Sequence, residues 1–409
     1  MVNFLTLDDF NFKNKTVLLR VDFNSPIEPK NHRILEDTRI RAHGETTIKE
    51  LSEKGAKTVI LAHQGRKGDP DFIPLKQHAE ILSKILKTPV RYVDDLYGEK
   101  ARAAIKRLKS GEILVLENVR DFALETKDGT PEDQAKTDLV KNLAPLADFF
   151  INDAFAAAHR AHVSMVGFTA VLPSGAGRIM ERELKSLSKV LETPEKPCIF
   201  VFGGAKADDS LEISKYVLDK GIATQVLTGG VIGQVFTAAK GYDLGKPNMK
   251  FLEKSEATKL IPGIRELVQK YKDRVRTPED FAVEKDGKRK EITTEELPTE
   301  CPIYDIGTKT VKSYGAAISK AKSVVISGPM GKYENSDFNY GTKNVLEQVA
   351  KSKAFSLAGG GHTIAAIELF KLTHKISYIS TAGGALVEFL MGKKLPGVDA
   401  LEKAASRTF

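Results

Sequence analysis

Short apolar runs rich in β-branched residues and leucine alternate with amphipathic segments along the first half of the chain. Between the first two runs, Asp37–Glu53 has the pattern of a helix. Near-continuous apolar strands that alternate with helices are typical of a parallel sheet covered on both faces. The runs predict strands at Val17–Val21, Thr58–Ala62, Val90–Val93, Ile113–Leu116 and Phe149–Ile151.

The second half repeats this alternation. Between Asp273 and Pro302 the charge density rises and the periodicity fades, which predicts a surface-exposed β excursion. From Lys393 to Val398 the helical pattern breaks, and we expect a short tail after it. The strands predicted here are Cys198–Phe202, Ala223–Leu227, Val324–Ser327, Phe355–Ala358 and Ser377–Ser380.

A glycine-rich segment at Gly167–Gly177 separates the two halves and is followed by a predicted helix, Arg178–Leu191, which prolines then end. The predicted fold class is therefore α/β, with two doubly wound parallel-sheet (Rossmann-like) domains joined by a hinge helix. We expect domains at residues 1–170 and 171–392, and a C-terminal tail at 393–409 that returns to the first domain.

Composition limits where the protein works and what kind of partner it binds. No stretch approaches the roughly 20 apolar residues of a membrane span, and no secretory signal opens the chain. The two cysteines, Cys198 and Cys301, favour a reducing cytoplasm over a disulfide scaffold. The net charge of +8 suggests an anionic partner. A nucleic-acid surface would interleave basic and aromatic residues, whereas here arginines and histidines follow strand ends, which favours a small, highly charged substrate.

Cationic and polar side chains follow five elements of the first half. In open parallel sheets ligands bind beyond the carboxyl ends of the strands, and several guanidinium groups there suit phosphate or carboxylate. Each arginine alone could be a surface ion pair, and His159-x-x-His162 could be a metal pair, but no third metal ligand is evident. The groups are Arg20–Asn24, Arg39, His63–Arg66, Glu117–Arg120 and, within Asp148–Ser164, the set His159, Arg160 and His162.

The strands of the second half end in glycines instead. Glycine permits close backbone approach, and helix starts beyond such turns present free N–H groups to phosphates, although plain tight turns would use the same residues. The turns are Gly203–Lys206, Thr228–Gly230, Ser327–Gly331, Ala358–Thr363 and Thr381–Gly384.

These residues, taken together and in order, resemble the phosphoglycerate kinase family, in particular its archaeal branch. The resemblance covers almost the whole chain and implies reversible phosphoryl transfer between 1,3-bisphosphoglycerate with ADP and 3-phosphoglycerate with ATP. It rests on Arg20–Asn24, Leu61–Arg66, Asn152–Phe155, His159–His162, Gly203–Lys206, Asp305–Lys309, Gly328–Glu334 and Leu395–Val398.

The resemblance also implies residue roles. Arg39 and Lys206 would stabilise charge during transfer, and residues 171–392 would form the nucleotide domain. The 3-phosphoglycerate site in the first domain would use Asp22, Phe23, Asn24, Arg39, His63, Gln64, Gly65, Arg66, Arg120 and Arg160. The nucleotide site would use Lys206, Glu334, Gly360, Gly361, His362 and Thr363.

Two positions depart from the common family pattern: Ser210 stands where a second lysine is usual, and His362 where an aspartate helps hold magnesium. We therefore expect no protein metal ligand, and Mg²⁺ bound through ATP or ADP. We expect no nucleic-acid or membrane partner, and a monomer or a homodimer. The alternative is a non-catalytic, two-domain anion-binding protein, which would explain the arginines but not Lys206 and Glu334.

Overall fold

The computed structural model describes residues 3–407, which divide into two compact units. The first contains the residues up to Lys185 together with those from Lys394 onward, and the second runs from Ser186 to Lys393. The division lies later than the expected boundary at residue 170. The reason is that Ser174–Ala176 adds a strand to the first sheet, and the start of the following helix also packs in the first unit.

The first unit is built on a six-stranded sheet in the order β3-β4-β2-β1-β5-β6, with every pair parallel. The central strand β1 places Arg20 opposite Leu61 of β2 and Asn152 of β5. The strands are β1 (Thr16–Arg20), β2 (Lys57–Leu61), β3 (Val90–Tyr92), β4 (Ile113–Val115), β5 (Phe149–Asn152) and β6 (Ser174–Ala176).

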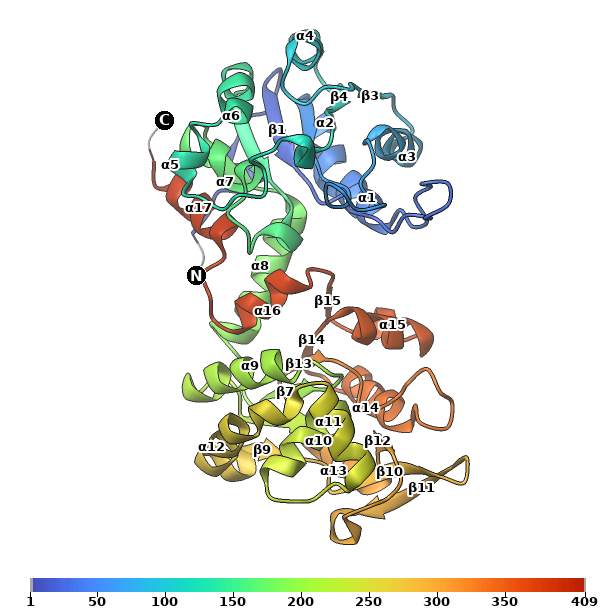
Figure 1. Cartoon of the computed structure of the whole chain (residues 1–409). Helices are drawn as coiled ribbons and strands as arrows, with labels where there is room; N and C mark the ends of the chain where they lie inside the picture. The colour runs from blue at the N-terminus through green and yellow to red at the C-terminus, as the bar shows by residue number, and fades with distance from the viewer. Residues whose placement is uncertain (1–2, 408–409) are drawn as a thin grey trace. The chain divides into compact units, whose positions relative to one another are not determined.

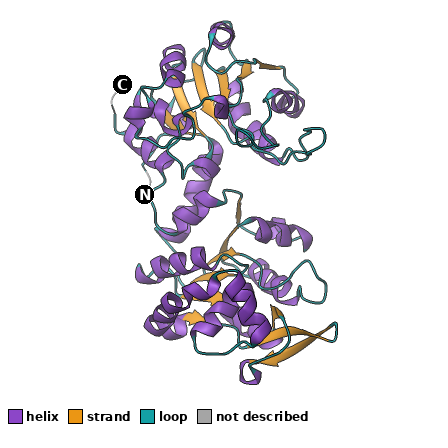
Figure 2. Cartoon of the chain, in the orientation of Figure 1, coloured by secondary structure: helices purple, strands orange, loops and turns teal. Residues whose placement is uncertain are grey.

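Helices cover both faces of this sheet (Figures 1 and 2). A hydrophobic cluster of buried side chains lies on each face. Side chains of β1 alternate between them, since Val17 and Leu19 belong to one cluster and Leu18 to the other. The first cluster includes side chains of α1 (Thr38–His43), α2 (Lys49–Glu53) and α3 (Lys76–Leu86). The second includes side chains of α4 (Glu99–Lys106), α6 (Asp138–Leu143) and α7 (Val163–Val166). The predicted doubly wound arrangement is confirmed.

The second unit has a parallel sheet in the order β15-β14-β13-β7-β8-β9. Its strands are β7 (Cys198–Phe202), β8 (Gln225–Thr228), β9 (Val275–Arg276), β13 (Ser323–Ser327), β14 (Phe355–Gly359) and β15 (Tyr378–Ser380). Its helices are α9 (Ala207–Asp219), α10 (Gly230–Ala239), α11 (Lys246–Lys254), α12 (Ile261–Tyr271), α13 (Thr308–Ile318), α14 (Tyr340–Lys351), α15 (Gly361–Leu369) and α16 (Gly384–Leu390).

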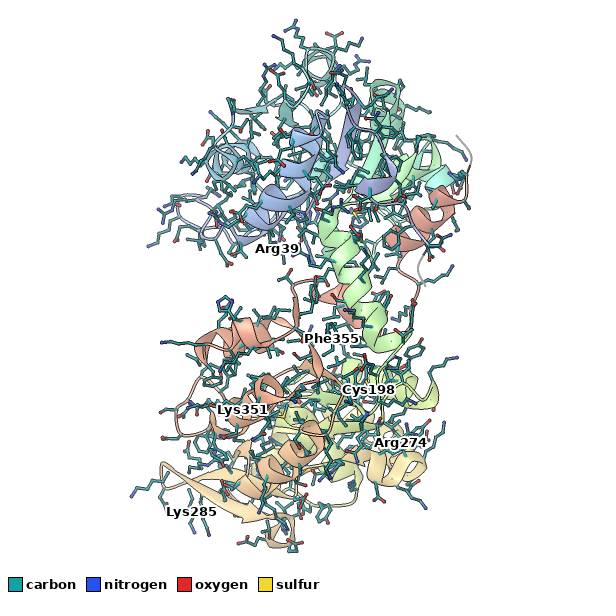
Figure 3. The ribbon with its side chains drawn as sticks, turned by 180° about the vertical axis from the view of Figure 1, so that it is seen from behind. Arg39, Cys198, Arg274, Lys285, Lys351 and Phe355 are labelled. Atoms are coloured by element: carbon teal, nitrogen blue, oxygen red, sulfur yellow. The ribbon has the colours of Figure 1, made fainter. Side chains whose placement is uncertain are left out.

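The charged excursion is a small antiparallel sheet, β11-β10-β12. It consists of β10 (Asp280–Lys285), β11 (Lys288–Thr293) and β12 (Ile303–Ile306). Lys285 lies at the end of the β10–β11 hairpin (Figure 3). The predicted β excursion is confirmed, and it extends one strand further than expected.

The sequence pattern predicts one helix near the domain boundary correctly but not the helix near the C-terminus. The predicted helix Arg178–Leu191 is present with those bounds as α8. The expected tail contains a helix that was not predicted, α17 (Pro396–Ala405), and from Lys394 onward it belongs to the first unit. Proline is tolerated at a helix start, where its missing N–H has no partner to lose, and α17 buries Val398 and Leu401. The short helix α5 (Pro131–Gln134) completes the first unit.

Among residues 3–407, no helix is long and apolar enough to cross a membrane.

Candidate active site

Arginine side chains gather at the carboxyl edge of the first sheet. Arg20 ends β1 and is almost completely buried. Burial, followed by the charges of Arg160, Arg20 and Arg66, lowers the pKa of Arg120 to about 10. Guanidinium groups that perturb one another in this way repel each other, and a multivalent anion between them relieves the repulsion. The arrangement is suited to binding a phosphate or carboxylate.

Histidines border this cluster in their neutral form. Burial, partly offset by Asp22, lowers the pKa of His63 well below its ordinary range. Burial and the charge of Arg160 lower the pKa of His162 to about 4. The imidazoles of His63 and His162 therefore add little positive charge to this edge. Among the described residues no group of three histidine, cysteine, aspartate or glutamate side chains could hold a metal ion.

A buried carboxyl group orients one of these arginines. Glu125 is 1% exposed and accepts hydrogen bonds from the backbone N–H of Ser164 (2.9 Å) and from its hydroxyl (2.5 Å). The same hydroxyl oxygen accepts from Nε of Arg20 at 2.8 Å. Burial raises the pKa of Glu125 to about 7, although Arg20 and Ser164 oppose the rise. Glu125 and Ser164 thus fix the position of Arg20, and both were missed because no sequence spacing links them to β1.

Asp22, Asn24 and Arg39 form the polar end of the loop after β1. Arg39, on α1 (Figure 3), donates a hydrogen bond to the Asp22 carboxylate. Burial opposes ionisation of Asp22, but the positive charge of Arg39 above all, together with that of Arg20, outweighs it and lowers its pKa. Oδ1 of Asn24 accepts from the backbone N–H of Gly65 at 2.8 Å, which joins this loop to the loop after β2.

Three of the residues expected to bind the substrate are packed into the protein or leave no room for a larger side chain. Phe23 is fully buried and packs against the rings of His43 and His78. Gln64 is fully buried. Its amide oxygen accepts a hydrogen bond from the backbone N–H of Ser25, and its NH₂ group donates to the backbone carbonyl oxygens of Ser25 and Asp71. A Cβ atom on Gly65 would lie 2.4 Å from a backbone carbon of Asp71. These residues shape the loops, whereas Arg66 is exposed.

Arg120 completes the connection between the loops, since its guanidinium donates to the carbonyl oxygen of Gly65. Its own backbone N–H donates to Oδ1 of Asn118 at 3.1 Å. The structure thus brings Asp22, Asn24, Gly65 and Arg120 into one bonded set.

In the second unit the glycine turns line a cavity of about 400 Å³ at the carboxyl edge of the sheet. Lys206 is exposed at the N-cap position of α9, and Gly360 holds the same position before α15. The first N–H groups of these helices have no intrahelical partner and favour an anion. The lining includes Gly203, Gly204, Lys206, Asp209, Ser210, Gly328, Gly360, Gly361, His362, Thr363, Gly383 and Gly384.

A second cavity of about 520 Å³ contains Glu334 and shares Gly204, Ala205, Pro329 and His362 with the first. The side chain of His362 is 75% exposed, with Nδ1 3.3 Å from the Tyr333 hydroxyl and 3.9 Å from Oε1 of Glu334. Two adjoining cavities, one at helix starts and one with an apolar and carboxylate lining, suit a nucleotide with its phosphates in the first.

Two glycines of these turns, Gly328 and Gly361, have different surroundings, which explain in different ways why glycine is present. A Cβ on Gly328 would lie 2.0 Å from the carbonyl oxygen of Gly203, and its φ is +88°, so this glycine allows β7 and β13 to end close together. A Cβ on Gly361 would meet no described atom within 4 Å. Space beside Gly361 is therefore free for a ligand.

Ser210, one of the two departures from the family pattern, forms a local hydrogen bond within its own helix. Ser210 donates its hydroxyl to the carbonyl oxygen of Lys206 at 3.1 Å, within the first turn of α9. The half-buried Asp209 lines the same cavity, and burial together with Asp208 raises its pKa. Asp209 was missed because acidic residues are common in any first helical turn.

Two α/β units, one with a cluster of arginines and the other with a glycine-lined cavity at helix starts, define the class of two-domain α/β phosphotransferases. The model of the family "Phosphoglycerate kinase" matches residues 7–393. The chain is 50% identical to the phosphoglycerate kinase of Methanococcus maripaludis, with 98% of each chain covered. It is 45% identical to that of Methanothermus fervidus, covering 100% of this chain and 99% of the relative.

A solved structure of the phosphoglycerate kinase from Pyrococcus horikoshii OT3 superimposes with a TM-score of 0.87 at 42% identity, covering 97% of this chain and 98% of that one. The chain belongs to the phosphoglycerate kinase family. Its members are transferases that use ATP and ADP as co-substrates and pass a phosphoryl group to or from a carboxyl group, a reaction of glycolysis.

Replacing Glu125 by Gln tests whether burial raises the pKa of its carboxyl group. A carboxyl whose pKa is raised on folding from 4.5 to about 7 contributes stability below the lower value, which is lost as the pH rises through the higher one. The loss is about 1.4 kcal/mol per unit of pKa. We expect the free energy of unfolding, measured with urea between about pH 5 and 8, to fall less steeply in Glu125→Gln than in wild type. Exposed Glu99→Gln is the control, and equal slopes in all three proteins would refute the assignment.

The two kinds of glycine predict opposite defects. Gly328→Ala should lose more than ~1 kcal/mol of stability, because its φ and the Gly203 carbonyl leave no room for Cβ. Gly361→Ala should keep the wild-type melting temperature but bind ADP more weakly, measured by calorimetry. An unstable Gly361→Ala protein, or one with undiminished ADP affinity, would contradict this division.

Proposed function

We propose that the first unit binds the phosphoglycerate through Asp22, Asn24, Arg39, His63, Arg66, Arg120 and Arg160. Phe23, Gln64 and Gly65 would act by shaping the loops that carry these groups. The observation that supports the proposal best is the position of Arg20, Arg120 and Arg160 near one another at one strand edge, where burial first and then the charges of Arg160 and Arg20 lower the pKa of Arg120. A substrate with one phosphate and one carboxylate matches such a cluster.

The second unit binds the nucleotide in this proposal. The phosphates lie at the starts of α9 and α15, near Lys206, Gly360 and Gly361. Thr363 acts indirectly, because its hydroxyl accepts a hydrogen bond of 2.7 Å from the backbone N–H of Gly328 and fixes the neighbouring turn. Glu334 accepts hydrogen bonds from the ribose.

Magnesium enters with the nucleotide. Mg²⁺ prefers oxygen ligands and keeps several waters, so the His362 imidazole is a poor ligand for it. The phosphates and water hold the ion, and the backbone of His362 at the start of α15 contacts phosphate.

The chemistry needs no activated serine or cysteine, because the attacking group is a substrate carboxylate or an ADP phosphate oxygen. Catalysis consists of positioning and charge stabilisation of an in-line transfer. Arg39 and Lys206 supply charge from the two substrate sites. Because those sites belong to different units, transfer requires hinge closure, which also excludes water from the acyl phosphate.

NADH loss in an assay coupled through 1,3-bisphosphoglycerate, started with 3-phosphoglycerate and ATP, tests the proposal. A non-catalytic anion-binding protein would bind 3-phosphoglycerate and give no NADH loss. Monomer or homodimer, a cytoplasmic location and the absence of a nucleic-acid partner stay predictions.

Arg39→Ala and Lys206→Ala should each lower kcat by ~10²–10³ while ground-state affinity changes little, because each removes a preorganised charge donor. Steady-state kinetics and calorimetric titration measure the two effects separately. The exposed cations Lys84 and Lys254 provide control substitutions to Ala that remove a charge elsewhere in each unit. Losses below tenfold, or equal losses of turnover and affinity, would exclude the catalytic role.

His362→Asp should tighten the apparent affinity for Mg²⁺ during turnover, because a carboxylate is an oxygen ligand where the imidazole is not. His362→Ala should leave that affinity nearly unchanged, and a magnesium titration of the rate measures both. A strongly raised magnesium requirement in His362→Ala would show that the imidazole participates.

A further inference from the structure

Asp153 caps the helix that connects the two units. It is 0% exposed, and its Oδ1 accepts from the backbone N–H groups of Ile179 (2.8 Å) and Met180 (3.2 Å), at the start of α8. A Cβ on Gly177 would lie 2.3 Å from this oxygen, so glycine is what lets the carboxylate reach the helix. Capping uses only one of the two carboxylate oxygens.

The second carboxylate oxygen of Asp153 forms a hydrogen bond with a histidine outside α8. Oδ2 of Asp153 lies 2.7 Å from Nδ1 of His43, which is 4% exposed at the end of α1. Nε2 of His43 lies 3.2 Å from the backbone nitrogen of Asp22. A backbone N–H can only donate, so Nε2 must carry a lone pair and the proton must sit on Nδ1, facing the carboxylate.

The chain of hydrogen bonds continues to the predicted catalytic arginine. The Asp22 carboxylate accepts from Arg39, and its Oδ1 accepts from the backbone N–H of Asn24 at 3.1 Å. The start of α8, Asp153, His43, Asp22 and Arg39 therefore form one sequence of contacts within the first unit. Its inner members are shielded from water, so water cannot replace a broken link at little cost.

We propose that His43 is a positioning residue that couples the start of α8 to the loop of Asp22 and Arg39. A shift of that loop when 3-phosphoglycerate binds changes the hydrogen bonds at the start of the connecting helix, and a shift of the helix changes the loop. The inference rests on the proposed binding of phosphoglycerate by Asp22 and Arg39. Asp153 alone would cap the helix, whereas only the imidazole connects that cap to the Asp22 backbone.

Two substitutions break this connection in different ways. His43→Phe keeps a ring but removes both hydrogen bonds. Asp153→Asn keeps an oxygen for the helix cap and turns an NH₂ group toward His43. The imidazole must then accept at Nδ1 and carry its proton on Nε2, where it meets the N–H of Asp22 donor to donor.

The experiment compares both variants with wild type and with Leu51→Ala, which removes a buried apolar side chain from the same helical region. The first readout is kcat with the KM for MgATP, well below the melting temperature of every variant. The second is amide hydrogen exchange at Ile179 and Met180, with and without 3-phosphoglycerate.

In wild type and in Leu51→Ala we expect 3-phosphoglycerate to slow exchange at both amides. In His43→Phe and Asp153→Asn this slowing should disappear, and kcat should fall about tenfold or more through misplacement of Arg39, with the KM for MgATP unchanged. The two substitutions combined should lower kcat no further than one alone, because they break the same connection. The inference is overturned if either variant keeps the wild-type kcat or the ligand-dependent slowing.

Calorimetric binding of 3-phosphoglycerate to wild type and to Arg39→Ala separates this outcome from failure of the proposed function. If wild type binds and Arg39→Ala binds with changed enthalpy, the substrate assignment stands whatever His43 does. If 3-phosphoglycerate does not bind wild type at all, both the assignment and the coupling fail.

Discussion

All strands of each six-stranded sheet run in one direction, and this constraint determines where chemistry can occur. Parallel strands bring their carboxyl ends to one edge, where the chain leaves the core and polar groups meet water. At that edge of the first sheet Arg20 lies beside Asn152 of the neighbouring strand. In the second, β7 and β13 end opposite each other at Phe202 and Ser327, and the glycines that follow lie close together.

Collecting positive charges at such an edge destabilises the protein without its substrate, and hydrogen bonds from buried groups hold the most buried of these arginines in place. Glu125 fixes Arg20 through Ser164, while the exposed Arg66 remains in water. The histidines contribute little to the repulsion, because burial keeps His63 and His162 neutral. The site is therefore organised before the substrate arrives, so little reorganisation is left for the transition state.

The sequence was informative wherever a role depends on local pattern. Helix α8 was predicted with its observed bounds, since its apolar spacing and the prolines after it are local signals. Strand β6 was not predicted and lies in the glycine-rich segment expected to separate the two halves, because Ser174–Ala176 has little apolar character and only its pairing with β5 makes it a strand. The same limit explains the missed helix α17, which is stabilised by burial of Val398 and Leu401.

Side chains that act through others left no signal in the sequence. Glu125, Ser164 and His43 are separated along the chain from the residues that they orient. Gln64 shows the converse: its place in a family motif suggested substrate contact, whereas its buried amide is used by the surrounding backbone.

The central claim is that the two units bind different substrates, the first the phosphoglycerate and the second the nucleotide. Amide hydrogen exchange of the whole chain, with 3-phosphoglycerate alone and with MgADP alone, tests this most directly. The account predicts that 3-phosphoglycerate slows exchange around Asn24, Gly65 and Arg120, and that MgADP slows it around Lys206 and Gly361. Slowing of the same strand-end amides by both ligands, or the reverse assignment, would contradict it.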